Sequence, residues 1–287
     1  MIVADTFCGP LDALPPAGAL VAVDRLPQSC GGCAANVAIG LARQGVPVDL
    51  AACTGRDPVG AFLREDLVRQ GVGVSRLRAV DGLPTSQTIV LLIADEDRRY
   101  LHLFGANAAF APGNPDAPAD GGMDPDLAPV IDGPWLASLA TLYAGGLYAM
   151  PAMTPERVAA LFRACRARGV RTVLDVVIPA GAPDPDPGPL AALLAVTDII
   201  LPNENEAARL TGESDPLRQC LALRAMGARA AAVTLGADGI IAADSDGCWH
   251  APAFPVPAVD PSGGGDAFAA GLIAALHRGA SFREAIP

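Results

Sequence analysis

The chain of 287 residues contains no lysine, because all twenty of its basic residues are arginine. Walker-type nucleoside triphosphatases, protein kinases, and enzymes that work through a Schiff base or pyridoxal phosphate each depend on a lysine. The absence of lysine therefore excludes these mechanisms for this protein.

Positive charge is also scarce relative to negative charge. The formal net charge is −11 and the pI is about 4.6, which argues against a nucleic-acid partner and against an anionic membrane surface. No uncharged apolar run reaches about 18 residues, so we expect no membrane span.

The seven cysteines are scattered and odd in number, and the first residues lack the pattern of a signal peptide. These features predict a protein of the reducing cytoplasm.

Hydrophobic residues make up 51% of the chain, enough for a sizeable core without disulfides or a structural metal. From about residue 34, β-branched runs alternate with stretches of helical period, the pattern of repeated βα units around a mostly parallel sheet. In the second half, helices are predicted at 154–168, 190–195, 204–210 and 216–226, and strands at 170–177, 198–201, 230–235 and 239–243.

The first third of the chain has a different pattern. Leu20 to Val23 and Ser86 to Ala94 alternate like exposed strands, and the latter continues through the charged turn at Asp95 to Arg99 into Tyr100 to Phe104. We expect a small β-layer beside the main sheet.

A glycine-rich segment near the C-terminus is the strongest chemical signal. Gly263, Gly264 and Gly265 precede a predicted helix that runs to about Arg278. Their backbone N–H groups and the helix dipole can bind a phosphate. Asp266, in the first turn, can accept a proton from a hydroxyl. On the glycines alone, a plain turn with Asp266 as a helix cap is the favoured interpretation.

The run from Asp260 to Gly271 resembles the C-terminal signature of the ribokinase (pfkB) family of carbohydrate kinases. Only Gly264 departs from that signature, at a position that usually holds Ala. The resemblance implies that Asp266 is the catalytic base and that Gly263, Gly264 and Gly265 form the anion hole.

An N-terminal segment is similar to a second signature of this family. It comprises Gly31, Gly32 and Asn36, followed by Gly55 to Gly60. Paired glycines let a substrate approach the backbone, and an Asn side chain both donates to and accepts from sugar hydroxyls. The resemblance implies that Gly31, Gly32 and Asn36 hold the acceptor; the alternative is a tight turn followed by a helix cap.

Three further segments fit the family in the right order. Asn203 to Glu206 resembles its N-x-x-E motif, which implies that Asn203 lies near the nucleotide and Glu206 near Mg²⁺. Thr234 to Gly239 resembles its strand-turn, which implies nucleotide contacts from Thr234, Gly236 and Gly239. The segment from Arg98 to Asn107 is similar to a lid of sugar kinases, which implies acceptor contacts from Arg99 and Asn107.

Two departures concern the acceptor site and the end of the chain. Gly9 stands where the family has an acceptor-binding Asp, so either Asp12 makes that contact or the contact is missing. The family continues past the catalytic helix with a segment that covers the adenine and completes a monovalent-cation site. This chain stops at Pro287, so we expect either that the C-terminus is shortened or that another subunit covers the gap, and K⁺ binding is left open.

The resemblance implies a ribokinase-like three-layer α/β sandwich with a mostly parallel central sheet. We expect one domain over 1–287, with lid strands inserted at about 11–28 and 86–104 that can also pair with a second copy. The implied activity is ATP- and Mg²⁺-dependent phosphorylation of a hydroxymethyl group of a sugar or sugar-like alcohol. The alternatives are a nucleoside kinase, a catalytically silent member that binds sugar or nucleotide, and a thiol oxidoreductase using Cys30 and Cys33.

Overall fold

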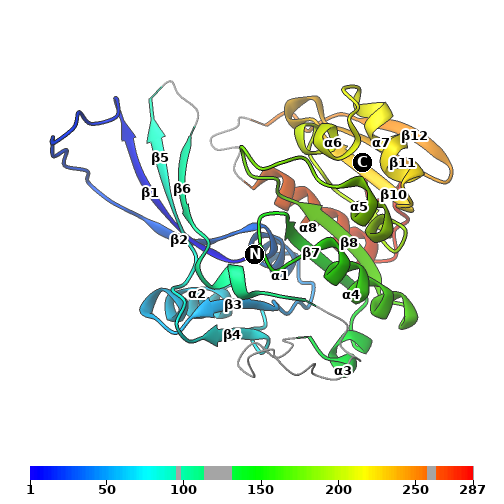
Figure 1. The fold of residues 1–287 in the computed structure, drawn as a ribbon, viewed down its shortest axis with the longest axis horizontal. Coiled ribbons are helices and arrows are strands. Elements are labelled where there is room, and N and C mark those ends of the chain that lie inside the picture. The colour runs from blue at the N-terminus through cyan, green and yellow to red at the C-terminus, as the bar shows by residue number, and fades with distance from the viewer. Residues whose placement is uncertain (95–97, 113–130, 257–262, 287) are drawn as a thin grey trace.

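Figure 1 shows the computed structural model of the chain, which describes residues 1–94, 98–112, 131–256 and 263–286. The charged turn at 95–97 and residues Asp260 to Ser262 of the C-terminal signature lie outside the described residues. The helices are α1 (Cys33–Arg43), α2 (Pro58–Arg69), α3 (Gly133–Ala137), α4 (Pro155–Ala167), α5 (Pro187–Leu194), α6 (Glu204–Thr211), α7 (Pro216–Ala225) and α8 (Gly264–His277), with short 3₁₀ turns η1 (Gly105–Ala109) and η3 (Gly236–Asp238).

The strands form three sheets. The largest contains, in spatial order, β12 (Gly247–Ala251), β11 (Ile240–Asp244), β10 (Ala230–Thr234), β9 (Ile199–Ile200), β8 (Arg171–Val176) and β7 (Thr141–Leu147). Its first four strands in chain order, β7 to β10, are parallel, whereas β11 and β12 are antiparallel to their neighbours.

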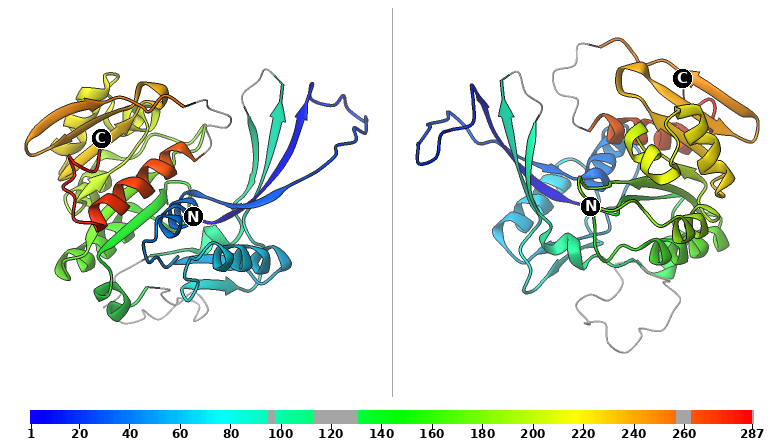
Figure 2. Two further views of the ribbon diagram at one scale, coloured as in Figure 1. Left: turned by 180° about the vertical axis from the view of Figure 1, so that it is seen from behind. Right: turned by 45° about the horizontal axis from the view of Figure 1, so that its top comes forward.

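Helices cover both faces of this sheet. On β8, Val173 packs with the apolar side chains of α1 and α8, whereas Leu174 and Val176 pack with those of α4 and α5. The alternation follows from the two-residue period of a strand, which sends successive side chains to opposite faces. Figures 1 and 2 show α1 and α8 on one side and α4 and α5 on the other. The three-layer sandwich with a mostly parallel sheet is therefore confirmed.

The lid is a second, four-stranded sheet that projects from the sandwich (Figure 2). Its order is β2 (Gln28–Gly31), β1 (Val3–Leu11), β5 (Gln87–Ile93) and β6 (Arg99–Leu103). The strand pair predicted over 86–104 is confirmed as the β5–β6 hairpin.

The strand predicted at Leu20 to Val23 is wrong. This stretch has no strand partner and is largely exposed, with Leu20 93% accessible. Alternating apolar residues form a strand only where a neighbouring strand and a buried face exist, and this stretch has neither. Within the predicted lid segment 11–28, only Leu11 and Gln28 belong to strands, at its two ends.

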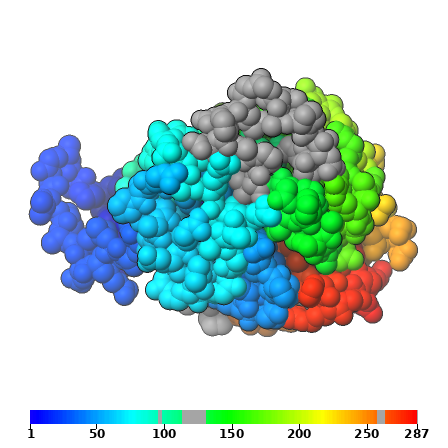
Figure 3. Space-filling view, turned by 90° about the horizontal axis from the view of Figure 1, so that it is seen from below, coloured from blue at the N-terminus to red at the C-terminus, as the bar shows by residue number. Residues whose placement is uncertain are grey.

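β3 (Ala52–Gly55) and β4 (Leu77–Val80) form a separate two-stranded parallel sheet. Seen from below, the region of β3, β4 and α2 lies beside that of α3 and the end of α8 (Figure 3). Among the described residues, β7 pairs with β8 only, so the outer edge of β7 joins no strand.

Local signals in the sequence determine the ends of the helices. Thr154 caps α4 through a hydrogen bond from the Arg157 amide (3.4 Å), and Pro155 occupies its first position, as predicted. No described helix is both long enough and apolar enough to span a bilayer.

Candidate active site

A hydrogen bond between Asn36 and Asp266 joins the two glycine-rich segments. Nδ2 of Asn36, in α1, donates to Oδ2 of Asp266, in the first turn of α8, over 2.8 Å. α1 and α8 pack side by side on one face of the main sheet (Figure 1), which brings together residues 230 positions apart. The sequence predicted each side chain for the site, and the structure places them in contact.

The start of α8 has no side-chain cap, and its three glycines leave free space. Gly263 adopts a left-handed conformation (φ 73°), and Gly264 and Gly265 begin the helix. All three are exposed, and among the described residues no atom outside the adjoining helix backbone lies within 4 Å of a Cβ placed on Gly264 or Gly265. A phosphate can therefore reach the N–H groups of this turn.

Gly31 and Gly32 are in contrast enclosed by the N-terminal segment that leads into β1. A Cβ on Gly31 would overlap the Asp5 carboxylate, and one on Gly32 would lie 2.9 Å from the Met1 carbonyl oxygen. Gly32 also has φ 90° and precedes α1. These two glycines allow the backbone to pass close to β1 and so set where α1, and with it Asn36, begins.

Two carboxyl groups affect a third one near the carboxyl end of β8. Asp175 is the penultimate residue of β8, and its pKa is raised far above the usual range by burial and by the charges of Glu206 and Asp266. Burial raises the pKa of Glu206 to about 7 and also raises that of Asp266, which the hydrogen bond from Asn36 partly offsets. Tyr143 donates its hydroxyl to Asp175 Oδ2 over 3.0 Å.

Sequence analysis missed Asp175 and Tyr143. The available signal was an acid at the end of a predicted buried strand, since ligands of parallel α/β sheets bind beyond the carboxyl ends of the strands.

Asn203 and Glu206 form a reciprocal cap at the start of α6. The Glu206 amide donates to Asn203 Oδ1 (2.9 Å), and the Asn203 amide donates to Glu206 Oε2 (3.0 Å). Within the described residues no group of three or more His, Cys, Asp or Glu is arranged to hold a metal. A site that offers one carboxylate beside two other acids still fits Mg²⁺, which keeps several waters and is bound largely through substrate phosphates.

The predicted nucleotide strand-turn lies next to this cap. Thr234 ends β10 and pairs with Asn203 through a parallel bridge, and its amide donates to the Pro202 carbonyl (3.1 Å). Gly236 is exposed, with free space around it, whereas a Cβ on Gly239 would overlap the Ala251 carbonyl. Gly236 is therefore accessible to a ligand. At position 239 a glycine is required because any side chain would collide with the Ala251 carbonyl.

The predicted lid residues have different surroundings. Asn107 is buried, and its amide group bonds both the amide (3.3 Å) and the carbonyl (2.8 Å) of Ile2. Arg99 is exposed on β6, and Asp12 is exposed just beyond β1, at the outer end of the lid (Figure 1). The roles of Arg99, Asn107 and Asp12 in acceptor binding stay predictions. The hydrogen bonds of Asn107 to Ile2 also hold the start of β1 in place.

A polar row that sequence analysis missed crosses the lid sheet. Asp5 on β1 hydrogen-bonds the Thr88 side chain on β5, and Thr88 Oγ1 lies 2.9 Å from His102 Nδ1 on β6. Burial raises the pKa of Asp5 to about 6. Single residues on three strands give no local pattern, so only the pairing of the strands reveals the row.

Cys30 and Cys33 do not have the environment of a redox pair. Both are buried, and burial raises the pKa of each thiol to about 12. A reactive thiol needs a lowered pKa and access to its partner. The oxidoreductase alternative is therefore disfavoured.

The open glycine turn at the start of α8 suits a phosphate at this end of the main sheet. The pfkB family carbohydrate kinase model matches residues 3–287. The chain belongs to this family of carbohydrate kinases.

Known relatives act on different sugars. The chain is 32% identical over 255 residues to an aminoimidazole riboside kinase of Salmonella typhimurium, covering 86% of this chain and 74% of that one. It is 33% identical over 258 residues to a fructokinase of Klebsiella pneumoniae, covering 88% and 78%. The ribokinase of Arabidopsis thaliana, solved with ribose and ATP, superposes with a TM-score of 0.80 at 24% identity and covers 99% of this chain and 86% of that one.

Proposed function

We propose that this kinase transfers the γ-phosphoryl group of ATP to a hydroxymethyl group of a sugar or sugar-like alcohol, with Asp266 as the base. The observation that carries the proposal is the Asn36–Asp266 hydrogen bond of 2.8 Å at the open start of α8. It places a carboxylate and an amide, both suited to a sugar hydroxyl, beside a turn suited to a phosphate.

Asp266 accepts the proton of the attacking hydroxyl. Burial raises the pKa of this carboxyl, which makes its ionised form a stronger base than an exposed aspartate. The amide of Asn36 stabilises the ionised form and orients the carboxylate.

The N–H groups of the glycine turn stabilise the charge on the phosphoryl group in flight. Gly263, Gly264 and Gly265 carry no side chain that could block the approach of its oxygens. Such preorganised donors contribute most of the rate in phosphoryl transfer, where the protein chiefly positions groups and balances charge.

The nucleotide binds over the carboxyl ends of β9 and β10. Thr234 and Gly236 line it, the buried Gly239 shapes the turn that presents Gly236, and Asn203 orients its phosphates. Glu206 holds Mg²⁺ through water, and the ion neutralises phosphate charge when bound. A cation at this place would also relieve the mutual repulsion of Asp175, Glu206 and Asp266.

The acceptor lies between the lid and Asn36, and Gly31 and Gly32 contribute by setting where α1, and with it Asn36, begins. Riboside, fructose and ribose kinases among the relatives and structural neighbours support a pentose, hexose or riboside acceptor. A nucleoside acceptor is therefore kept as the second candidate.

Release of ADP tests the proposal. Purified protein is given ATP and Mg²⁺ with a panel of pentoses, hexoses, sugar acids and nucleosides, in K⁺ and in Na⁺, beside Asp266→Asn. We expect turnover on one acceptor class and a loss of about 10²–10⁴-fold in the variant, the range for removing a general base. A folded protein that binds ATP yet turns over no acceptor would instead support the silent-member alternative, and near-normal turnover by Asp266→Asn would exclude that residue as the base.

We also propose that two copies pair through their lids. The lid carries exposed apolar side chains, among them Ile89 (44% accessible), Leu101 (61%) and Leu103 (46%), and a patch of this kind commonly marks an interface. Sedimentation of the parent and of Leu101→Glu tests this: a dimer that the substitution splits is expected, and a monomeric parent contradicts it. The cytoplasmic location stays a prediction of the sequence.

A further inference from the structure

The two faces of the lid sheet carry different side chains. Asp5 on β1, Thr88 on β5 and His102 on β6 are paired residues, so their side chains lie on one face and form the polar row. Their neighbours along each strand alternate to the other face. There, Ala4 and Cys30 pack with the apolar side chains of α2. The polar row therefore lies on the face of the lid that α2 leaves uncovered.

The inner end of the polar row lies next to the start of α1. The Asp5 carboxylate fills the space beside Gly31 on this face. The next residue, Gly32, accepts a hydrogen bond from the Asn36 amide through its carbonyl (2.9 Å), and the Asn36 side chain binds Asp266. A short series of contacts thus joins the polar row to the proposed base, so the row borders the proposed acceptor space.

The hydrogen bonds within the polar row have a fixed direction. Above its pKa of about 6 the Asp5 carboxylate only accepts, and the Thr88 hydroxyl gives it the single proton that it carries. His102 Nδ1, which lies 2.9 Å from Thr88 Oγ1, must then donate to that oxygen. Burial lowers the pKa of His102, which favours the neutral ring. The other ring nitrogen, Nε2, is left as an acceptor.

The polar row consequently offers two hydrogen-bond acceptors and no free donor. In the part of the chain that the structure describes, His102 Nε2 has no partner, and the Asp5 carboxylate accepts only from Thr88. The Phe104 ring meets the imidazole edge-on, with centroids 4.8 Å apart and planes at 84°, which helps to hold its orientation. Two oriented acceptors suit a ligand that donates twice, such as a sugar with two free hydroxyl groups.

The charge of this face disfavours an anion. Arg99 is the only Lys or Arg of the four lid strands, and it alternates to the other face with Leu101, which disfavours its predicted contact with the acceptor. Arg98 precedes β6 and lies four residues, or about 13 Å, from His102 along the strand. A carboxylate or phosphate at the polar row would therefore meet the charge of Asp5 and find no hydrogen-bond donor.

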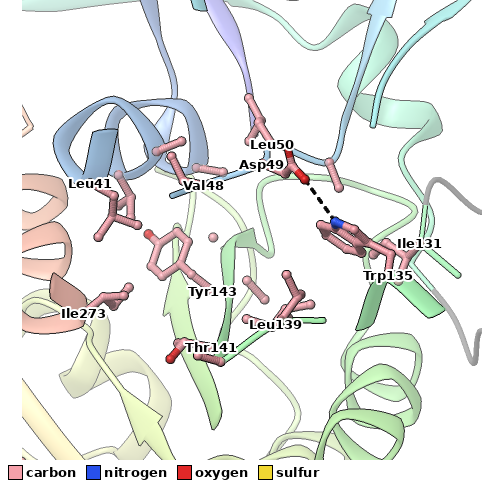
Figure 4. Close-up of a pocket in the computed structure, with 18 of the residues that line it drawn as sticks. Leu41, Val48, Asp49, Leu50, Ile131, Trp135, Leu139, Thr141, Tyr143 and Ile273 are labelled. Carbon is pink, nitrogen blue, oxygen red and sulfur yellow. Dashed lines mark hydrogen bonds between the residues drawn. The ribbon is translucent and has the colours of Figure 1, made fainter. Parts of the chain in front are cut away.

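A cavity of about 390 Å³ between β7 and the segment that leads into β3 is a poorer place for a sugar (Figure 4). Apolar side chains form most of its wall, including Leu41, Val48 and Ile273. Asp49 Oδ2, at one end, already accepts a hydrogen bond from the Trp135 indole (3.3 Å). The hydroxyl groups of a sugar would stay largely unpaired against such a wall, which is unfavourable for each of them.

We propose that the polar row selects the acceptor: Asp5 and Nε2 of His102 accept hydrogen bonds from two hydroxyl groups of an uncharged sugar or sugar-like alcohol, and the row rejects sugar acids and sugar phosphates. The inference rests on the proposed function and narrows its acceptor. It also accounts for a half-buried carboxylate whose ionised form destabilises the fold, since such local conflicts are expected at functional sites.

Calorimetric titration without ATP tests the selection. The uncharged probes are D-ribose, D-fructose and adenosine, and the anionic probes are ribose 1-phosphate and D-gluconate. We expect at least one uncharged probe to bind, about 100-fold more tightly than either anion, because like charges brought together weaken binding strongly. An anionic probe that binds as tightly as the best uncharged one, or no binding of any uncharged probe, would overturn the proposal.

Two variants remove one acceptor each. Asp5→Asn and His102→Phe should each weaken binding of the uncharged probe about tenfold, the effect of losing one hydrogen bond to a ligand. Asp5→Asn should also reduce the discrimination against anions at least tenfold, because it removes the like charge. A role only in holding the strands together would leave that discrimination unchanged, and this result would overturn the proposal.

Thr6→Val is the matched control. Thr6 follows Asp5 on β1, and its hydroxyl accepts from Gln28 Nε2 (3.1 Å) on the opposite face of the lid, so its loss should leave binding and discrimination unchanged. Equal effects of Thr6→Val and Asp5→Asn would contradict the assignment. Because the titration contains no ATP, it does not depend on turnover, and a failure of the proposed kinase activity is recognised separately from ADP release.

Discussion

Glycines precede or begin both α1 and α8, but they have opposite roles at the two helices. At α8, Gly263, Gly264 and Gly265 are exposed, and among the described residues no atom lies close to a Cβ placed on Gly264 or Gly265, so these glycines provide access. At α1, Gly31 packs against Asp5 of β1 and Gly32 against Met1 and Ile2, so these glycines provide close packing. The comparison teaches that a glycine motif has a ligand role only where the missing side chain leaves empty space, which the sequence alone does not reveal.

Gly265→Ala should separate function from stability at α8. The added methyl meets no protein atom, and Ala is the better helix former, so Tm should stay equal or rise slightly. Because the methyl occupies the space for the phosphoryl oxygens, we expect kcat to fall by about 10²-fold, the loss seen when one such donor is removed.

Gly271→Ala is the matched control. Gly271 lies in the same helix, also has free space around it, and is two turns away from the glycine turn. Its substitution should leave kcat unchanged. Equal activity of Gly265→Ala and Gly271→Ala would remove the glycine turn from the mechanism.

Gly32→Ala should have the reverse outcome. The residue has φ 90° and a Cβ would lie 2.9 Å from the Met1 carbonyl oxygen, so the substitution should lower the free energy of unfolding by about 2–3 kcal/mol. Denaturant unfolding checks this, with Gly18→Ala as control, because Gly18 lies in an exposed loop with free space around it. A variant as stable as that control would contradict the packing role.

Asp5→Asn should stabilise the protein in a pH-dependent way. Burial raises the pKa of Asp5 to about 6, so the folded state binds a proton more tightly than the unfolded state does. The penalty for its ionised form is absent below pH of about 4 and complete above pH of about 6. We expect Asn to add about 1–2 kcal/mol at pH 7.5, and little at pH 4. A gain that is independent of pH would contradict this origin.

The smallest effect concerns the pH profile of the reaction. The Asn36 amide stabilises the ionised form of Asp266, so Asn36→Ala should raise the pKa of that carboxyl further. The acidic limb of kcat/KM against pH should therefore move to higher pH. Asn36→Asp is not a suitable comparison, because it adds a charge, whereas Asn36→Gln keeps the amide and should restore part of the parent profile. An acidic limb that Asn36→Ala leaves in place would mean that Asn36 does not act through Asp266.

The sequence predicts the fold well where local chemistry and tertiary packing agree. The helices predicted at 154–168 and 204–210 begin where α4 and α6 begin, at the caps formed by Thr154 and Asn203. The strand predicted at Leu20 to Val23 was wrong because alternating apolar and polar residues form a strand only when a partner strand exists.

The candidate site was partly predictable for a similar reason. A motif whose residues are neighbours in the sequence, such as Gly263 to Asp266, could be recognised from the sequence. The structure adds that Asn36 contacts this motif. The shifted pKa values of Asp175 and Asp5 were not predictable, since they arise from burial and from neighbours that are distant in the chain. The division of the strands into three sheets also depends on long-range pairing that no local pattern encodes.

The distance along the chain between Asn36 and Asp266 has a consequence for biosynthesis. The two residues are 230 positions apart, so a ribosome has to make almost the whole chain before the pair can meet. No N-terminal fragment that lacks α8 can contain the site. Recovery of activity during refolding therefore reports the docking of the last helix, and any earlier intermediate is silent in that assay.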